Sequence, residues 1–165
     1  SELQAVATAA AAAAAALDAI KTAAQDNSAG TTPSLADFAT AGITGVDANN
    51  FAAINSALNT ASVNGQAVDT TPEIQTLVDA YKAVLTAADG LPDNGAQPDQ
   101  SHYELLGISG INSQPKVQLL GQVIDAKPGT AVDTVGELQK LADAVAAVKA
   151  EFPAMFGQPD RKSVV

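Results

Sequence analysis

The stretch EIQTLVDA, residues 73–80, recurs as ELQKLADA at residues 137–144, an offset of 137 − 73 = 64 residues. From the first copy onward, apolar residues follow one another at alternating intervals of three and four positions. They are Ile74, Leu77, Tyr81, Val84 and Ala88. This spacing is typical of one face of an α-helix with a seam of the coiled-coil type. Because no alternating strand pattern competes with it, the repeat predicts an all-α fold.

The same three-and-four spacing of apolar residues occurs in the second copy and in a further copy at the start of the chain. The second copy has its seam at Leu138, Leu141, Val145, Val148 and Phe152. A third copy opens the chain as ELQ, residues 2–4, at an offset of 73 − 2 = 71, in a helix expected over residues 2–25. Its seam would consist of Leu3, Val6, Ala10, Ala13, Leu17, Ile20 and Ala24. Since alanine lines the middle of this seam, we expect a neighbouring helix to approach it closely.

Two further phrases recur in the same order as the helical one. VDT at residues 68–70 returns at residues 132–134, again 64 residues later. GITGV at residues 42–46 matches GISGI at residues 107–111, at an offset of 65. Several phrases that recur in one order indicate an internal duplication.

Residues that favour helix ends predict the boundaries of the elements in the first copy. Thr71 is expected to cap the helix over residues 72–88, with Pro72 at its first position. Ser34 should cap a short helix that ends at Gly42. Asp47 should cap a middle helix that carries Phe51, Ile54, Leu58 and Ala61 on one face and ends near residues 64–65.

The second copy carries comparable signals, with differences. A short helix is expected with Ser101 before Tyr103 and Leu106, and Gly107 stops it. A middle helix should run from Pro115 to just before residues 128–129, and Thr134 should cap the long helix that follows. The loop over residues 89–100, rich in Pro, Asp, Gly and Asn, is the best candidate for a hinge.

Together these elements predict tandem three-helix-bundle repeats that share or are linked by long helices, in an elongated molecule. The first helical repeat is expected over residues 1–89 and the second over residues 72–152, so that both use the helix at 72–88. Residues 153–165 are either a tail or the start of a next element. The chain begins at Ser1 without Met, and we expect it to be a fragment of a larger protein.

Composition excludes several classes of function. The formal net charge is −10, from 18 acidic and 8 basic residues, which disfavours nucleic acid and anionic lipid as partners. The absence of cysteine excludes disulfides, thiol catalysis and zinc sites built on thiolates. The apolar tract at residues 5–16 follows Glu2 rather than a basic region and contains Thr8, so we expect neither a signal peptide nor membrane insertion.

The side chains that could carry out catalysis do not form a recognisable constellation. His102 is the only histidine, and no Gly-x-Ser-x-Gly turn supplies a nucleophile for it to activate. Asp79 and Asp143 occupy equivalent places in the two copies, next to the apolar seam on the polar side, where we expect solvated charges. The sequence therefore predicts a protein that is not an enzyme, with no catalytic residue and no cofactor.

Two clusters of oxygen-bearing residues are candidates for calcium sites. They consist of Asp89, Asp93, Asn94 and Asp99, and of Asp47, Asn49 and Asn50. Neither has the residue order of an EF-hand loop, and ordinary turns and helix caps account for both. No metal site is predicted, although calcium binding by the loop at 89–100 stays open.

The residues around the first glycine turn resemble two related families. FATAGIT at residues 38–44, followed by Phe51, AIN at 53–55 and the helix from Glu73, resembles the three-helix albumin-binding (GA) module of Gram-positive surface proteins. The same residues are similar to the Ala-, Asp- and Thr-rich helical repeats of very large bacterial adhesins. That similarity covers most of residues 33–88 and, more loosely, 101–151, where Lys116 replaces Phe51 and the Asn pair is lost.

The resemblance implies stacked three-helix bundles and a place outside the cell or at the bacterial surface. The expected function is a non-enzymatic structural spacer, in which neighbouring repeats of the same chain are the main partners. A protein ligand on the bacterial or host surface is a further possible partner. The alternative is a GA-like module that binds a host protein such as serum albumin. Against it, residues 47–60 contain no Lys or Arg, and their large apolar residues belong to the expected core face.

Overall fold

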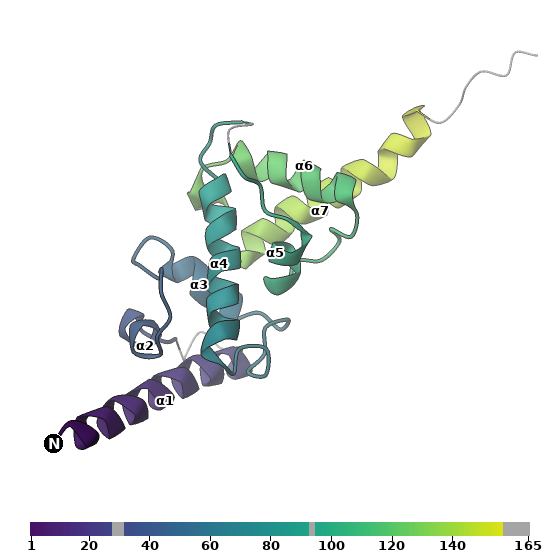
Figure 1. Cartoon of the computed structure of the whole chain (residues 1–165). Helices are drawn as coiled ribbons and strands as arrows, with labels where there is room; N and C mark the ends of the chain where they lie inside the picture. The colour runs from purple at the N-terminus through teal and green to yellow at the C-terminus, as the bar shows by residue number, and fades with distance from the viewer. Residues whose placement is uncertain (28–31, 93–94, 157–165) are drawn as a thin grey trace, which may run out of the picture.

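The computed structural model describes residues 1–27, 32–92 and 95–156, with side chains through residue 148 (Figure 1). Within this part of the chain, regular structure is helical apart from one isolated antiparallel bridge between Asp89 and Pro128. The predicted all-α fold class is confirmed.

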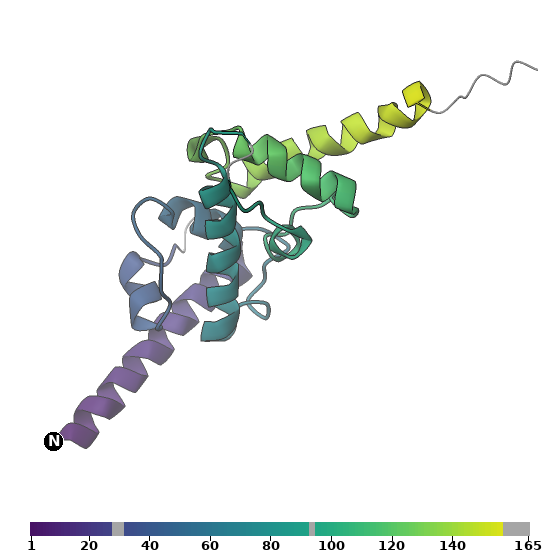
Figure 2. The same cartoon turned by 45° about the horizontal axis from the view of Figure 1, so that its top comes forward.

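The described residues form seven α-helices and one short 3-10 helix. In chain order these are α1 (Glu2–Asp26), α2 (Leu35–Thr40), α3 (Phe51–Leu58), α4 (Thr71–Ala87), α5 (Gln100–Leu105), α6 (Gln114–Asp125), η1 (Gly129–Ala131) and α7 (Val135–Phe156). Helix α4 stands in the middle, with α1 at one end of the molecule and α6 and α7 at the other (Figures 1 and 2). It packs against α3 on one side and against α5 and α6 on the other.

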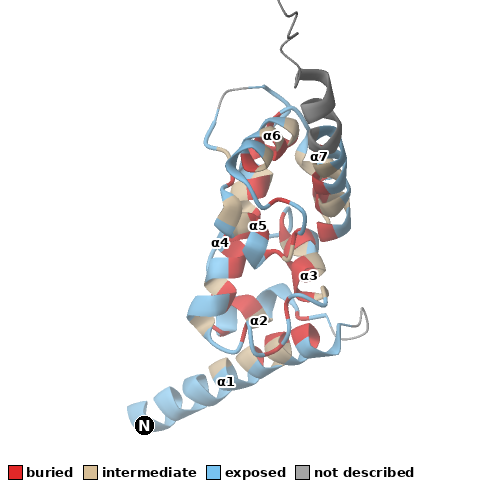
Figure 3. Cartoon of the chain, turned by 90° about the vertical axis from the view of Figure 1, so that its right-hand side faces the viewer, coloured by how far each residue is buried: buried red, intermediate tan, exposed pale blue. Residues whose placement is uncertain are grey.

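Helix α4 has a well-defined start and is buried on more than one face. Its N-cap is Thr70, whose hydroxyl accepts from the backbone N–H of Glu73 while the Glu73 carboxylate accepts from the backbone N–H of Thr70, a reciprocal capping box. The helix buries Ile74, Leu77, Val78, Ala80, Tyr81, Val84 and Ala87. These residues cover a larger part of the helix circumference than the apolar stripe of a helix that has one face exposed to solvent. Neighbouring elements must therefore cover α4 on two sides (Figure 3).

The two short helices end in the same way. After α2, the backbone N–H of Gly42 donates to the Ala39 carbonyl and that of Ile43 donates to the Phe38 carbonyl, at 3.1 and 2.8 Å. This pair of bonds is a Schellman motif, which requires a left-handed residue, and Gly42 has φ 81°. After α5, Gly107 and Ile108 form the equivalent bonds with Glu104 and Tyr103, at 3.0 and 2.9 Å.

The predicted starts of α4 and α5 were wrong by one and two residues. Helix α4 is capped by Thr70 rather than Thr71, because only Thr70 stands three residues before Glu73. The hydroxyl of Thr71 instead donates to the Ala41 carbonyl at 3.0 Å, which ties α4 to the end of α2. Helix α5 is capped by Asp99, while Ser101 lies inside its first turn and donates to the Asp99 carboxylate.

The middle helix of the first copy is shorter than predicted. Asp47 does not cap it; its carboxylate accepts from the backbone N–H groups of Asn49 and Asn50 in a turn, at 2.8 and 3.3 Å. The helix therefore begins at Phe51 and ends at Leu58 rather than near residues 64–65. Ile54 and Leu58 are buried as expected, but Ala61 lies beyond the helix and is exposed.

Helix α1 has the predicted length but not the predicted environment. Its C-terminal half buries Ala16, Ile20, Ala23 and Ala24 against α2 and α3. In its N-terminal half, Leu3 is 85% exposed, Val6 is 68% exposed and Ala10 is also exposed. The prediction that a close neighbour covers the alanine seam is therefore wrong for residues 3–10, which are all exposed, while Ala13 is half-buried (Figure 3). At the other end, Val148 is 45% exposed, while Phe152 lies beyond the described side chains.

Candidate functional site

The first glycine turn is held by a single glutamine of α4. The backbone N–H of Thr44 donates to Gln75 Oε1 at 2.8 Å, and Gln75 Nε2 donates back to the Thr44 carbonyl at 3.1 Å. The carboxamide thus satisfies both backbone groups of one residue. Its Nε2 also donates to Asp79 Oδ1 at 3.0 Å, which fixes its orientation one helical turn away.

The second copy repeats this arrangement bond for bond. The backbone N–H of Ser109 donates to Gln139 Oε1 at 2.9 Å, and Gln139 Nε2 donates to the Ser109 carbonyl at 3.3 Å. Gln139 Nε2 also donates to Asp143 Oδ1 at 2.8 Å. The recurrent turn and the recurrent helix therefore bind each other in both copies; the sequence shows the two repeated phrases but not their pairing.

Apolar and glycine residues set the geometry of both turns. Ile43 and Ile108 are buried, so each turn inserts an aliphatic side chain beside the glutamine pairing. Gly45 and Gly110 have φ 77° and 83°, a region that other residues rarely adopt. The turns consequently have a fixed shape, and each presents one residue's N–H and carbonyl to a side-chain amide.

Different residues stabilise the second glycine of each turn. Asn50 Nδ2 donates to the Gly45 carbonyl at 2.8 Å, and Asn50 Oδ1 accepts from the backbone N–H of Asp47 at 2.9 Å. In the second copy, Lys116 Nζ donates to the Gly110 carbonyl at 3.0 Å. The loss of the Asn pair and the replacement of Phe51 by lysine therefore keep the hydrogen bond while changing its donor.

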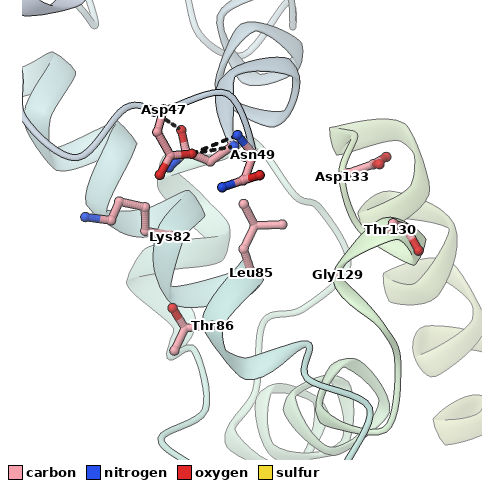
Figure 4. Close-up of a pocket in the computed structure, with 9 residues that line it drawn as sticks. Asp47, Asn49, Lys82, Leu85, Thr86, Gly129, Thr130 and Asp133 are labelled. Carbon is pink, nitrogen blue, oxygen red and sulfur yellow. Dashed lines mark hydrogen bonds between the residues drawn. The ribbon is translucent and has the colours of Figure 1, made fainter.

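A pocket of about 490 Å³ lies between the turn before α3, the side of α4 and the segment around η1 (Figure 4). Its lining residues are Asp47, Asn49, Asn50, Lys82, Leu85, Thr86, Gly129, Thr130 and Asp133. Loss of hydration and the neighbouring Glu137 raise the pKa of the Asp133 carboxyl above its usual range. The lining contains no histidine, cysteine or serine, so it offers polar contacts but no activated nucleophile of those types.

The residues weighed as catalytic or metal-binding candidates have structural contacts. His102 stands in the first turn of α5, where its Nδ1 accepts from the backbone N–H of Asp99 at 3.1 Å. The hydroxyl of Ser101, followed by the contacts with His102, lowers the pKa of the Asp99 carboxyl. Asp79 and Asp143 are exposed and accept from the two glutamines.

Asp47, Asn49 and Asn50 lie together in the turn before α3, where they bond to one another, whereas Asp89 and Asp99 of the other calcium candidate have separate structural contacts. Asp89 accepts from the backbone N–H of Leu91 at 2.8 Å, and Asp99 caps α5. Asp93 and Asn94 lie outside the described residues. Among the described residues, no three His, Cys, Asp or Glu side chains are placed to hold a metal ion.

Helix α1 is long and apolar enough to cross a membrane when judged by length and composition alone. Its most apolar window has a mean hydropathy of 1.6, and 11% of that window is buried. A signal sequence or the core helix of a soluble protein meets the same criterion, so the finding is weak evidence about the surroundings of the chain.

Comparisons with protein-family models, curated protein sequences and solved structures found no match to this chain.

Proposed function

We propose that this chain is a non-enzymatic structural spacer made of tandem helical repeats, a segment of a large bacterial cell-surface or secreted adhesin-like protein. The supporting observation is the pairing of Thr44 with Gln75 and of Ser109 with Gln139 through the same hydrogen bonds. In this proposal the N-terminal part of α4, which contains Gln75, is the last helix of the first repeat, and the C-terminal part is the first helix of the second repeat. A helix used twice joins repeats without a flexible linker.

The distribution of contacts supports a linear array. Helix α1 packs against α2 and α3, whereas α4 packs against α3, α5 and α6, and α7 packs against α6 and α3. Apart from the contact between α3 and α7, these contacts join elements that are close in the sequence, and such contacts let a repeat protein grow in one direction. Two interactions stiffen the joint: the Tyr81 hydroxyl donates to the Val132 carbonyl, and the Val135 backbone N–H donates to Ser56 Oγ.

The placement of the large side chains favours a spacer over a binding module. Phe38, Tyr81 and Tyr103 are fully buried, and the rings of Phe38 and Phe51 pack edge to face with centroids 6.3 Å apart. Most binding energy at protein interfaces comes from a few such residues presented to a partner. On α3, where a GA-like module would use a helix face, Ala53, Ile54, Ala57 and Leu58 are all buried.

Small-angle X-ray scattering tests the array. A compact domain of 165 residues would have a radius of gyration of about 15 Å, from the general scaling of size with chain length. We expect a clearly larger value and a distance distribution with an extended tail. A radius at the compact value would remove the array.

Calorimetric titration with serum albumin tests the alternative function. We expect no binding tighter than about 10 µM, roughly −7 kcal/mol. A submicromolar dissociation constant that is lost on changing an exposed residue of the α3 region, such as Ala52→Arg, would establish the albumin-binding function instead.

A further inference from the structure

Helix α1 carries the phrase that binds a glycine turn in α4 and α7, but no described turn lies on it. Glu2, Leu3 and Gln4 repeat the Glu-Ile-Gln and Glu-Leu-Gln phrases at the start of those helices. The Gln4 carboxamide forms no hydrogen bond with any residue that the structure describes, whereas Gln75 and Gln139 each form bonds to a turn and to an aspartate.

Helix α1 corresponds to α4 in two registers, one for each half. Its buried half matches at an offset of 84 − 20 = 64, which places Ile20 on Val84 and Ala16 on Ala80, all four buried. Its opening phrase matches at an offset of 71. The difference, 71 − 64 = 7, is one heptad, and seven residues return a helix to nearly the same face, within about 20°. Helix α1 is therefore equivalent to α4 with two helical turns inserted. Gln4 lies on the same side of α1, relative to its buried face, as Gln75 does on α4.

The apolar positions beside Gln4 are those that α4 buries under its turn. Leu3 and Val6 correspond to Ile74 and Leu77, which are 0% and 2% exposed, yet they are 85% and 68% exposed themselves. On α4 those side chains belong to the same core as Ile43 of the turn and Phe38 of the short helix. Helix α1 thus has the glutamine and the two aliphatic side chains in the same register as α4. No glycine turn among the described residues covers them.

We propose that the N-terminal half of α1, residues 2–13, is a docking face for a short capped helix followed by a Gly-Ile-Thr/Ser-Gly turn. Gln4 pairs there with the backbone of the Thr or Ser. The inference rests on the proposed repeat function and names the partner surface. Both such turns of this chain are held by Gln75 and Gln139, so the occupant comes from another repeat of the same kind.

A lipid bilayer fits this face less well. Residues 16–24 pack against α2 and α3, which leaves residues 2–15 without a fully buried side chain. Fourteen residues at 1.5 Å each span about 21 Å, short of the roughly 30 Å hydrocarbon core. The acidic character of the chain adds no attraction to anionic headgroups.

The test supplies the missing turn in front of the full chain. Residues 32–70, which contain α2, its turn and α3, are fused upstream of Ser1, and backbone hydrogen exchange is measured for residues 3–10. We expect their protection to rise by at least about tenfold relative to the unfused chain, as a covered helix turn exchanges more slowly than an exposed one. The Gln4 side-chain amide resonances should shift at the same time.

Two matched variants of the fusion separate docking from a general stabilising effect. Gln4→Ala should lose most of the added protection, and Ile43→Asp, placed only in the added copy, should lose all of it. Gln4→Ala should not affect the unfused chain, since Gln4 is exposed, and the change in the added copy leaves the native Ile43 untouched. Unchanged exchange at residues 3–10 in the fusion would overturn the proposal.

Two further measurements address other occupants of the face. Co-sedimentation of the unfused chain with phosphatidylcholine vesicles, abolished by Leu3→Asp, would assign it to membrane. Dimerisation in analytical ultracentrifugation, abolished by the same variant, would assign it to a second copy of α1. Either result overturns the proposal. A failed docking test together with an extended scattering profile of the unfused chain would remove this inference and leave the proposed spacer function standing.

Discussion

Helices α1 and α4 carry matching phrases near their N-termini, Glu-Leu-Gln and Glu-Ile-Gln, but the two phrases lie in different surroundings. On α4 the phrase is covered by a glycine turn, and Ile74 is completely buried; on α1 its counterpart Leu3 is almost fully exposed. The sequence of a helix face therefore specifies what it can bind, while burial depends on whether a partner is present. Hydrophobic stabilisation follows the area removed from water, so equivalent residues should contribute very different free energies.

The largest effect expected from this comparison is on Ile74. Ile74→Ala removes buried methyl and methylene groups and leaves a cavity, which should lower the free energy of unfolding by about 2–5 kcal/mol. Leu3→Ala, its counterpart on α1, should change that free energy by less than about 0.5 kcal/mol. Urea unfolding followed by far-ultraviolet circular dichroism measures both, and equal losses would contradict the exposed state of α1.

A second comparison concerns the first glycines of the two turns. Both Gly42 and Gly107 have positive φ, so alanine costs about 1–2 kcal/mol at either position. A β-carbon on Gly42 would meet only Thr71 Cγ2 at 3.9 Å, whereas one on Gly107 would collide with the Ser62 side chain. Gly107→Ala should therefore destabilise the protein by a further ~1–3 kcal/mol. The double variant Gly107→Ala, Ser62→Gly should recover most of that extra loss in thermal denaturation; no recovery would mean that the second turn does not rest on the first copy.

The buried tyrosines differ in their hydroxyl groups. Tyr81 donates to the Val132 carbonyl at 3.1 Å, and Tyr81→Phe should cost about 1–2 kcal/mol, because the carbonyl loses its partner in a buried place. The Tyr103 hydroxyl is buried and has no hydrogen-bond partner among the residues that the structure describes. Phe38 occupies the equivalent position in the first copy. Tyr103→Phe should therefore leave the free energy of unfolding unchanged or raise it. Differential scanning calorimetry of the two variants would contradict this account if Tyr103→Phe were the more damaging.

The smallest expected effect is the pH dependence of the two capping boxes. The hydrogen bond with Thr70 lowers the pKa of Glu73, and the bond with Thr134 lowers that of Glu137. A carboxyl whose pKa is lower in the folded state stabilises the fold above its unfolded pKa and loses that contribution as pH falls through its folded pKa. Stability should therefore fall below about pH 4.

Glutamine substitutions measure each box separately. Glu73→Gln keeps an acceptor for the capping box but cannot titrate, so the acid-side slope of stability should flatten. Glu137→Gln should flatten the slope as well, and it should also lower the pKa of Asp133, which Glu137 helps to raise. Carboxyl chemical shifts of Asp133 followed by NMR check this second effect. An unchanged Asp133 titration would show that the two carboxylates do not interact.

The helices could be predicted because their signals are local. The three-and-four spacing around Tyr81, the stop at Gly42 and the cap at Thr134 depend only on residues within a few turns of one another. The predicted caps are wrong where more than one residue that favours helix ends stands within three positions. Thr70 is chosen over Thr71 by the reach of Glu73, and Asp47 is drawn into a turn by the backbone of Asn49 and Asn50.

The candidate site could be predicted only in part, because its bonds join distant residues. The recurrence of Gln75 and of the Thr44 turn was visible in the sequence, but their pairing spans 31 positions and leaves no local signature. The pocket beside Lys82 likewise combines residues of the first copy with Asp133 of the second. The exposure of Leu3 was missed because a helical seam carries the same pattern whether or not a neighbour covers it.

The proposed sharing of α4 is tested most directly by native-state hydrogen exchange of its amides in two variants, Leu58→Ala in α3 and Leu120→Ala in α6. Both leucines are fully buried, one on each side of α4. If α4 belongs to both repeats, its amides near Tyr81 exchange among the slowest in the chain, and each variant speeds their exchange. If one variant speeds amide exchange in its own helix but leaves the exchange of α4 unchanged, the two copies are separate bundles. The proposal that both repeats share α4 is then wrong.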